Sequence, residues 1–143
     1  MKGTLSHELE ISLPADEIWS VYRGLELAEL VVKLLPTVIY KMDLVEGTPL
    51  VQSYKEKFTK IDDEKRIKEA YVVEGGYLEL GFISYMVRFE VIEKSEADSI
   101  IMSTIEYEVD EDFASKASLI STAPLAIIHE TVGKYLIEKK SNA

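Results

Sequence analysis

Three side chains capable of acid–base chemistry, Tyr54, Glu56 and Lys68, lie in two neighbouring stretches of sequence that alternate like β-strands. Successive side chains of a strand point to opposite faces, so Tyr54, Glu56 and Phe58 share one face while Lys57 belongs to the other. The face with lysines suits solvent, and the face with aromatic rings suits the interior. One apolar pocket could therefore hold a phenol, a carboxylate and an amine.

The segment between these strands, residues 61–65 (IDDEK), is rich in turn formers and predicts an antiparallel hairpin. A three-residue loop centred on Asp63 would place Lys68 opposite Phe58 and diagonal to Glu56, about 7–8 Å away at the backbone. A two-residue loop would send Lys68 to the outer face. The alternative interpretation of Lys68 and Glu56 is an exposed ion pair between strands, which contributes only about 0–1 kcal/mol.

The chain of 143 residues carries a formal net charge of −10 and no cysteine. This length predicts one domain over residues 1–143 with a sizeable core, and the absence of cysteine fits a reducing compartment. The acidic balance argues against binding to nucleic acid. No apolar run approaches the ~20 residues that span a bilayer, so we expect a cytoplasmic protein without a membrane span.

The two histidines, His7 and His129, do not suggest a metal site. They have no cysteine partners and no paired spacing, and no glycine-rich nucleotide motif is present, so we expect no metal and no other cofactor. His7 alternates with Leu5 and Leu9 on a strand face and is expected to be structural. His129 is expected at the surface of a helix.

The remaining sequence predicts an α+β fold. A strand over residues 2–12 is followed by two short helices, the first starting at Pro14 and ending at Gly24, the second over residues 26–35. Strands are expected over residues 38–46, 51–61, 66–74, 78–94 with an interruption near Gly81, and 99–109. A long helix, kinked or interrupted at Pro124, follows residues 110–112 and runs to about residue 140. We expect a curved antiparallel sheet wrapped around this C-terminal helix, with an internal hydrophobic cavity between them.

Several of these segments resemble one branch of a plant protein family. The chain is similar to norcoclaurine synthases, and more broadly to the class-ten pathogenesis-related and major latex proteins with the birch-pollen-allergen (helix-grip) fold. The resemblance covers nearly the whole chain and implies a seven-stranded sheet gripping the long helix. It also implies that the protein is located in the cytosol of latex or other plant cells. The segments that carry it are residues 2–10 (KGTLSHELE), 54–58 (YKEKF), 61–66 (IDDEKR), 73–78 (VEGGYL) and 105–109 (IEYEV).

The resemblance implies a stereoselective Pictet–Spengler condensation of dopamine with 4-hydroxyphenylacetaldehyde. The catalytic lysine of the norcoclaurine synthases matches Lys68. Their catalytic glutamate matches Glu56, and their catalytic tyrosine matches Tyr54. A buried lysine can protonate the departing carbinolamine oxygen, and a carboxylate can remove the ring proton. The phenol can orient the substrate through a hydrogen bond.

One polar position of that site is changed. The family aspartate falls on Val87, in an apolar face with Tyr85 and Phe89, which suits the binding of a bulky alkaloid. We therefore expect a protein that binds benzylisoquinoline alkaloids, with Ile120, Pro124 and Ile128 of the helix facing the cavity or simply packing on the sheet. The expected ligand-binding residues are Tyr54, Glu56, Phe58, Lys68, Tyr85, Val87, Phe89, Ile120, Pro124 and Ile128.

Two other functions stay open. The alternative is an enzyme that performs the condensation on a phenolic aldehyde and an amine, or isomerises a morphinan ketone. A third is the binding of a hormone such as cytokinin or abscisic acid. The ligand and the oligomeric state, including a homodimer, are not fixed by the sequence.

The connection at Gly47–Thr48 is shorter than the family pattern. Roughly fifteen family positions, including a glycine-rich loop and one strand, are absent from a part that usually lines the pocket mouth. Either the chain has lost them, or the sequence joins two pieces of a longer chain. Deleting an internal strand would strip a sheet of paired backbone groups, which favours the second explanation.

Overall fold

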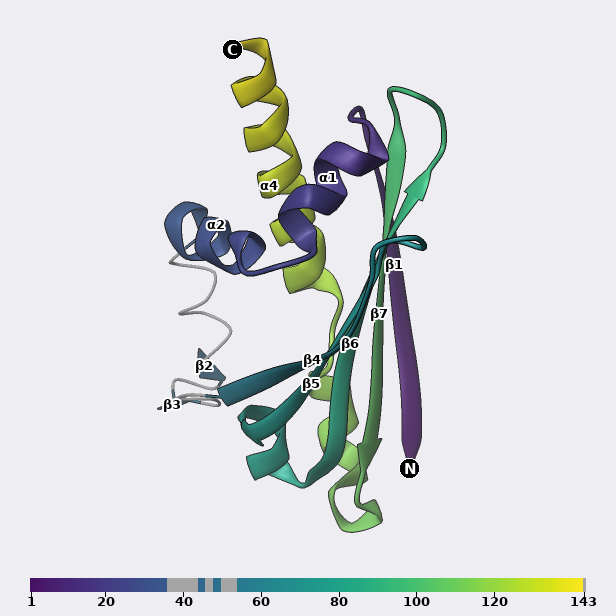
Figure 1. Cartoon of the computed structure of the whole chain (residues 1–143). Helices are drawn as coiled ribbons and strands as arrows, with labels where there is room; N and C mark the ends of the chain where they lie inside the picture. The colour runs from purple at the N-terminus through teal and green to yellow at the C-terminus, as the bar shows by residue number, and fades with distance from the viewer. Residues whose placement is uncertain (36–43, 46–47, 50–53, 143) are drawn as a thin grey trace.

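The computed structural model describes residues 1–35, 44–45, 48–49 and 54–142. An antiparallel sheet of five strands has the order β1-β7-β6-β5-β4, and β2 pairs separately with β3 (Figure 1). The elements in chain order are β1 (Lys2–Ile11), α1 (Ala15–Tyr22), α2 (Glu26–Leu34), β2 (Leu44–Val45), β3 (Thr48–Pro49), β4 (Tyr54–Asp62), β5 (Ile67–Gly75), the 3₁₀ helix η1 (Gly76–Leu80), β6 (Phe82–Glu93), β7 (Ser99–Val109), η2 (Glu111–Leu119) and α4 (Ala123–Ser141).

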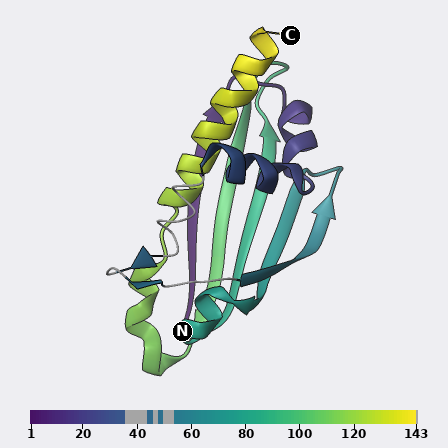
Figure 2. The same cartoon turned by 90° about the vertical axis from the view of Figure 1, so that its left-hand side faces the viewer.

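The three α-helices of the described residues, α1, α2 and α4, cover the same face of the sheet. Figure 2 shows α4 running along that face, with α1 and α2 on the same side. Helix α1 contacts β6, α2 contacts α4, and α4 contacts β1. The α+β architecture and the covering C-terminal helix are as the sequence predicts. No helix in the described ranges is long and apolar enough to cross a membrane.

The core under the helices consists of two clusters. The first lies beneath α1 and the middle of α4 and contains Trp19, Val91 and Ile128, with Phe89 packed against it. The second lies towards η2 and contains Phe82, Ile105 and Ile120. Leu125 at the start of α4 packs against both clusters, so it joins the two halves of the core.

The interruption expected near Gly81 is present, since Gly81, with a φ of 98°, separates η1 from β6, but residues 78–80 belong to η1 and not to a strand. The C-terminal helical segment is interrupted just before Pro124, because η2 ends at Leu119 and α4 begins at Ala123. Pro124 thus lies in the first turn of α4, where a missing N–H costs no hydrogen bond. The large sheet of the described residues has five strands, not seven. Most of the strand expected over residues 38–46 lies outside the described residues.

The β4–β5 hairpin forms with a different register from the expected one. Asp62 pairs with Ile67, which leaves a loop of residues 63–66, and Lys68 pairs with Ile61. Phe58 pairs with Ala70, and Thr59 is an extra residue that forms a bulge between Phe58 and the following pair. The bulge reverses the alternation within β4. The loop has four residues, whereas the sequence predicts three or two. Because of the bulge, Lys68 still lies on the inner face of the sheet.

Candidate functional site

Lys68 is the buried charged residue at the centre of the candidate site. Its side chain is 6% exposed, on the face of β5 that the helices cover. Nζ donates hydrogen bonds to the carbonyl oxygens of Tyr22, at 3.1 Å, and Gly24, at 2.9 Å. It also lies 4.0 Å from the ring centroid of Phe58. The expected contact between Lys68 and Phe58 exists, but it is diagonal and not across a strand pair.

These contacts explain how an ammonium group is tolerated inside the protein. Tyr22 is the last residue of α1, and carbonyls at the end of a helix have no partner within the helix. The negative end of the helix dipole and the face of an aromatic ring both favour a cation. The amine is thus held at a fixed point between α1 and the sheet.

Tyr54 and Glu56 are described only through their backbone. In β4, Tyr54 pairs with Gly75 and Glu56 pairs with Val72. Val72 is buried and lies on the same face of β5 as Lys68, four residues further along, or about 13 Å at the usual rise of a strand. The predicted diagonal pairing of Glu56 with Lys68 is therefore wrong. The grouping of the three polar side chains stays a prediction, since two of them lie outside the described part.

The apolar residues expected in the site are divided between the two core clusters. Val87 pairs with Ala70 and with Ile105, so it lies on the covered face and packs against the second cluster. Tyr85 belongs to the same cluster and stacks on Tyr77 at 4.7 Å between centroids.

The helix residues are divided in the same way. Ile120 is buried in the second cluster and Ile128 in the first, while Pro124 is partly buried. Phe89 lies opposite Lys68 and packs against the first cluster. Packing of these helix residues on the sheet is observed. The internal cavity stays a prediction.

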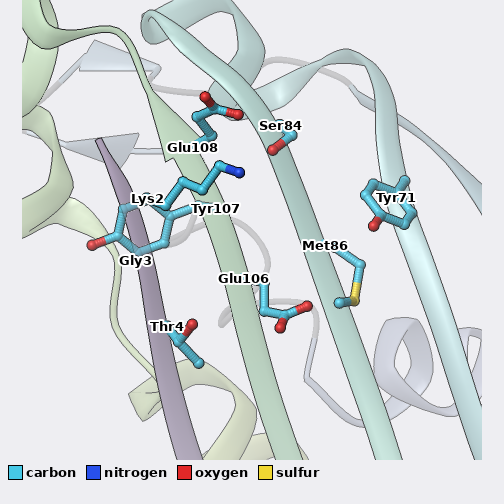
Figure 3. Close-up of a pocket in the computed structure, with 9 residues that line it drawn as sticks. All are labelled: Lys2, Gly3, Thr4, Tyr71, Ser84, Met86, Glu106, Tyr107 and Glu108. Atoms are coloured by element: carbon cyan, nitrogen blue, oxygen red, sulfur yellow. The ribbon is translucent and has the colours of Figure 1, made fainter.

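A hollow of about 250 Å³ lies on the other face of the sheet. A cross-strand row of Tyr71, Met86, Glu106 and Thr4 forms its floor (Figure 3). These residues alternate with the inner row to which Val87 belongs. The outer hollow is therefore separated from Lys68 by the sheet and is not part of the candidate site.

Sequence reasoning missed a buried polar network beside Lys68. His129, expected at the surface, is 0% exposed. The Tyr22 hydroxyl lies 2.8 Å from its Nδ1, and the Ser103 hydroxyl lies 2.5 Å from its Nε2. The sequence does contain a pattern that indicates burial of His129. The residue falls on the apolar stripe of α4, at helical spacing from Leu125, Val132 and Leu136. Within the described ranges, no group of three or more acidic, histidine or cysteine residues could hold a metal ion.

The family of the chain follows from its sequence. Residues 1–139 match the "Pathogenesis-related protein Bet v 1 family". The chain belongs to the Bet v 1 family. Among Bet v 1 proteins, it is 51% identical to norbelladine synthase of Narcissus pseudonarcissus, with 99% of this chain and 96% of that protein covered. It is 39% identical to S-norcoclaurine synthase 2 of Papaver somniferum, with 98% and 68% covered.

Solved structures agree with this placement within the Bet v 1 family. A point mutant of norcoclaurine synthase from Thalictrum flavum, in complex with a transition-state analogue, superposes with a TM-score of 0.81 at 32% identity. The match covers 98% of this chain and 97% of that one. A ginseng major latex-like protein shares the fold, with a TM-score of 0.66 at 20% identity and 94% and 97% covered. The relatives named as synthases support the enzyme alternative better than the alkaloid-binding interpretation.

The comparison also bears on chain length. The alignment with norbelladine synthase extends over 157 positions, more than the 143 residues of this Bet v 1 protein. The relative therefore carries residues that this chain lacks. The place of the gap, predicted at Gly47–Thr48, involves residue 47, which lies outside the described residues.

Proposed function

We propose that the protein is an enzyme that condenses an aromatic amine with an aromatic aldehyde. The observation that carries this proposal is Lys68, a lysine buried under the helices with its ammonium fixed by two carbonyls. The names of the relatives support it, because the chain is 51% identical to norbelladine synthase of Narcissus pseudonarcissus and 39% identical to S-norcoclaurine synthase 2 of Papaver somniferum. A norcoclaurine synthase has also been solved in complex with dopamine and hydroxybenzaldehyde.

The condensation requires acid catalysis at one oxygen atom. The amine nitrogen forms a bond to the aldehyde carbon, and its proton moves to the former carbonyl oxygen to give a carbinolamine. Breaking the C–O bond then requires a proton on the departing hydroxyl, which leaves as water and gives an iminium ion. In this proposal Lys68 donates that proton from its buried position.

Ring closure adds a second requirement, namely a base. When a ring carbon of the amine attacks the iminium carbon, the ring must lose a proton to become aromatic again. We assign this step to Glu56, and the orientation of the substrate to Tyr54, following the family pattern. Isomerisation of a morphinan ketone would use the same acid–base pair and is a less supported use of the site.

The first prediction concerns Lys68. Replacing Lys68→Met removes the proton donor, so kcat/KM for condensation of dopamine with 4-hydroxyphenylacetaldehyde should fall by about 10²–10⁴-fold. Lys57→Met, on the opposite face of the same hairpin, is the matched control and should leave kcat/KM unchanged. The product is quantified by chiral chromatography. Racemic product formed by the wild-type protein at the uncatalysed rate would reject the proposed function.

Alkaloid binding is the second candidate, and Val87 is the observation that favours it. A valine in place of the family acid makes the inner face more apolar and removes a charged group. Calorimetric titration with a papaverine-like alkaloid distinguishes the two. If the wild-type protein binds the alkaloid saturably and condenses no amine with any aldehyde, alkaloid binding is its function and condensation is not.

A further inference from the structure

Tyr22 connects the buried network to Lys68 through two different groups. Its hydroxyl lies 2.8 Å from His129 Nδ1, while its carbonyl oxygen accepts a hydrogen bond from Lys68 Nζ at 3.1 Å. The side chain of Tyr22 is fully buried, with the Phe89 ring edge-on at 5.8 Å between centroids. Tyr22 therefore links the buried network, through its hydroxyl, to the ammonium, through its backbone carbonyl.

The network continues beyond Tyr22 to the central part of the sheet. His129 is on α4, and its Nε2 lies 2.5 Å from the hydroxyl of Ser103 on β7. Tyr22, His129 and Ser103 are each 0% exposed. One chain of hydrogen bonds thus ties α1 to α4 and α4 to β7, which are three elements that meet only in the folded protein.

All three side chains are uncharged at neutral pH. Burial lowers the pKa of His129 to about 3, with a smaller contribution from nearby His7. Burial also raises the pKa of the Tyr22 phenol. A neutral imidazole has one donor and one acceptor, and each hydroxyl can rotate to complement it. The network can therefore satisfy both ring nitrogens without any charge, which suits a structural anchor and not a proton donor.

We infer that Tyr22 is a positioning residue for Lys68. Its phenol, anchored by His129 and Ser103, fixes the end of α1 so that the carbonyls of Tyr22 and Gly24 stabilise the ammonium form. The inference rests on the proposed function in one respect, namely that Lys68 is the proton donor. Among the contacts of the described residues, the ammonium meets the two carbonyls and the Phe58 ring, and Phe89 of β6 pairs with Lys68 in the sheet.

The decisive experiment measures the pKa of Lys68 directly. In protein labelled with ¹³C-lysine, the Lys68 signal is assigned by its loss in Lys68→Arg and is followed through a pH titration by NMR. Tyr22→Phe removes only the hydroxyl that anchors the ring. Because the carbonyls are then less firmly placed, the Lys68 titration should move to lower pH. Condensation should lose about tenfold in kcat with KM nearly unchanged, because the ammonium is no longer held in the position for proton transfer.

Two further variants make the result specific. Tyr71→Phe makes the same chemical change on the outer face of β5, three residues from Lys68, and should leave the Lys68 titration as in the wild type. Ser103→Ala weakens the network from its far end and should shift the titration in the same direction by a smaller amount. It decides the question if Tyr22→Phe does not fold.

The outcomes separate this inference from the proposed function. A Lys68 titration in folded Tyr22→Phe that is superimposable on that of the wild type would overturn the positioning role. Wild-type protein without condensation activity would overturn the proposed function, whereas the NMR titration would still decide the role of Tyr22.

Discussion

Val87 occupies a position on the inner face where a carboxylate would meet few polar partners. It lies between Ala70 of β5 and Ile105 of β7, and its side chain packs with the second core cluster. An acid at this position would be costly to ionise and would keep a raised pKa. Such a group could act on a bound amine or phenol, which a valine cannot do.

Val87→Asp tests whether the remaining site still works as the family pattern implies. We expect kcat/KM for the dopamine condensation to rise about tenfold, because a second acid–base group returns to the inner face. We also expect a lower free energy of unfolding, by about 1–3 kcal/mol, because a polar group replaces a methyl-bearing one in a packed cluster. Steady-state kinetics and urea denaturation measure the two effects.

The control for this change is Val87→Asn, which has a similar size and polarity but no acid–base function. It should lose a comparable amount of stability and gain no activity. If the asparagine variant gained as much activity as the aspartate variant, the role assigned to the carboxylate would be wrong.

At the scale of elements, the β4–β5 hairpin is clamped to α1 at its tip. Asp63 accepts hydrogen bonds from Trp19 Nε1, at 2.9 Å, and from Arg23 Nε, at 2.8 Å. On the other side of the loop, Arg66 pairs with Asp16 of α1 at 2.7 Å. Lys68 follows directly after this clamp, so the clamp sets how closely β5 approaches the end of α1.

Asp63→Asn weakens the clamp because it removes the charge that Arg23 binds. The Arg23 guanidinium and the Trp19 N–H both lower the pKa of Asp63 and so favour its ionised form. We expect faster amide hydrogen exchange at the hairpin tip. Glu64→Gln removes a charge from the same loop and should leave this exchange unchanged. Unchanged exchange in Asp63→Asn would contradict the clamp.

The elements were largely predictable from the sequence, whereas their contacts were not. Alternation and turn residues were sufficient for the β4–β5 hairpin, but its register depends on a bulge at Thr59, which alternation does not reveal. The spacing of Lys68 from the end of α1 is a tertiary property, so its carbonyl partners could not be foreseen. His129 differs from its prediction for another reason. Its polar side chain predicts an exposed position, whereas its place on the apolar stripe of α4 decides that it is buried.

At the scale of the whole molecule, burial of His129 makes stability depend on pH. Its pKa is lowered from 6.5 to about 3 in the folded protein. Between about pH 3 and pH 6.5, His129 therefore binds a proton in the unfolded chain but not in the folded protein. As the pH falls from about 6.5 towards 3, the free energy of unfolding should decrease by about 1.4 kcal/mol per pH unit from this group.

His129→Gln isolates this contribution, because glutamine offers one donor and one acceptor but does not titrate. Between pH 7 and pH 5, the wild type should lose about 2 kcal/mol more unfolding free energy than the variant. Urea denaturation of both proteins across this range measures the difference. The acidic side chains are the same in the two proteins, so parallel curves would contradict the burial of a neutral His129.

The pairing of β1 with β7 has a consequence for how the protein is made. Lys2 pairs with Glu108, and the ladder continues to Ile11 opposite Ser99, so β1 joins the sheet only through a strand distant in sequence. On the ribosome, β1 emerges long before its partner, and until then its backbone donors and acceptors remain open to other chains. The nascent chain therefore cannot complete its sheet until β7 has left the exit tunnel, and chains that stop before β7 are expected to aggregate.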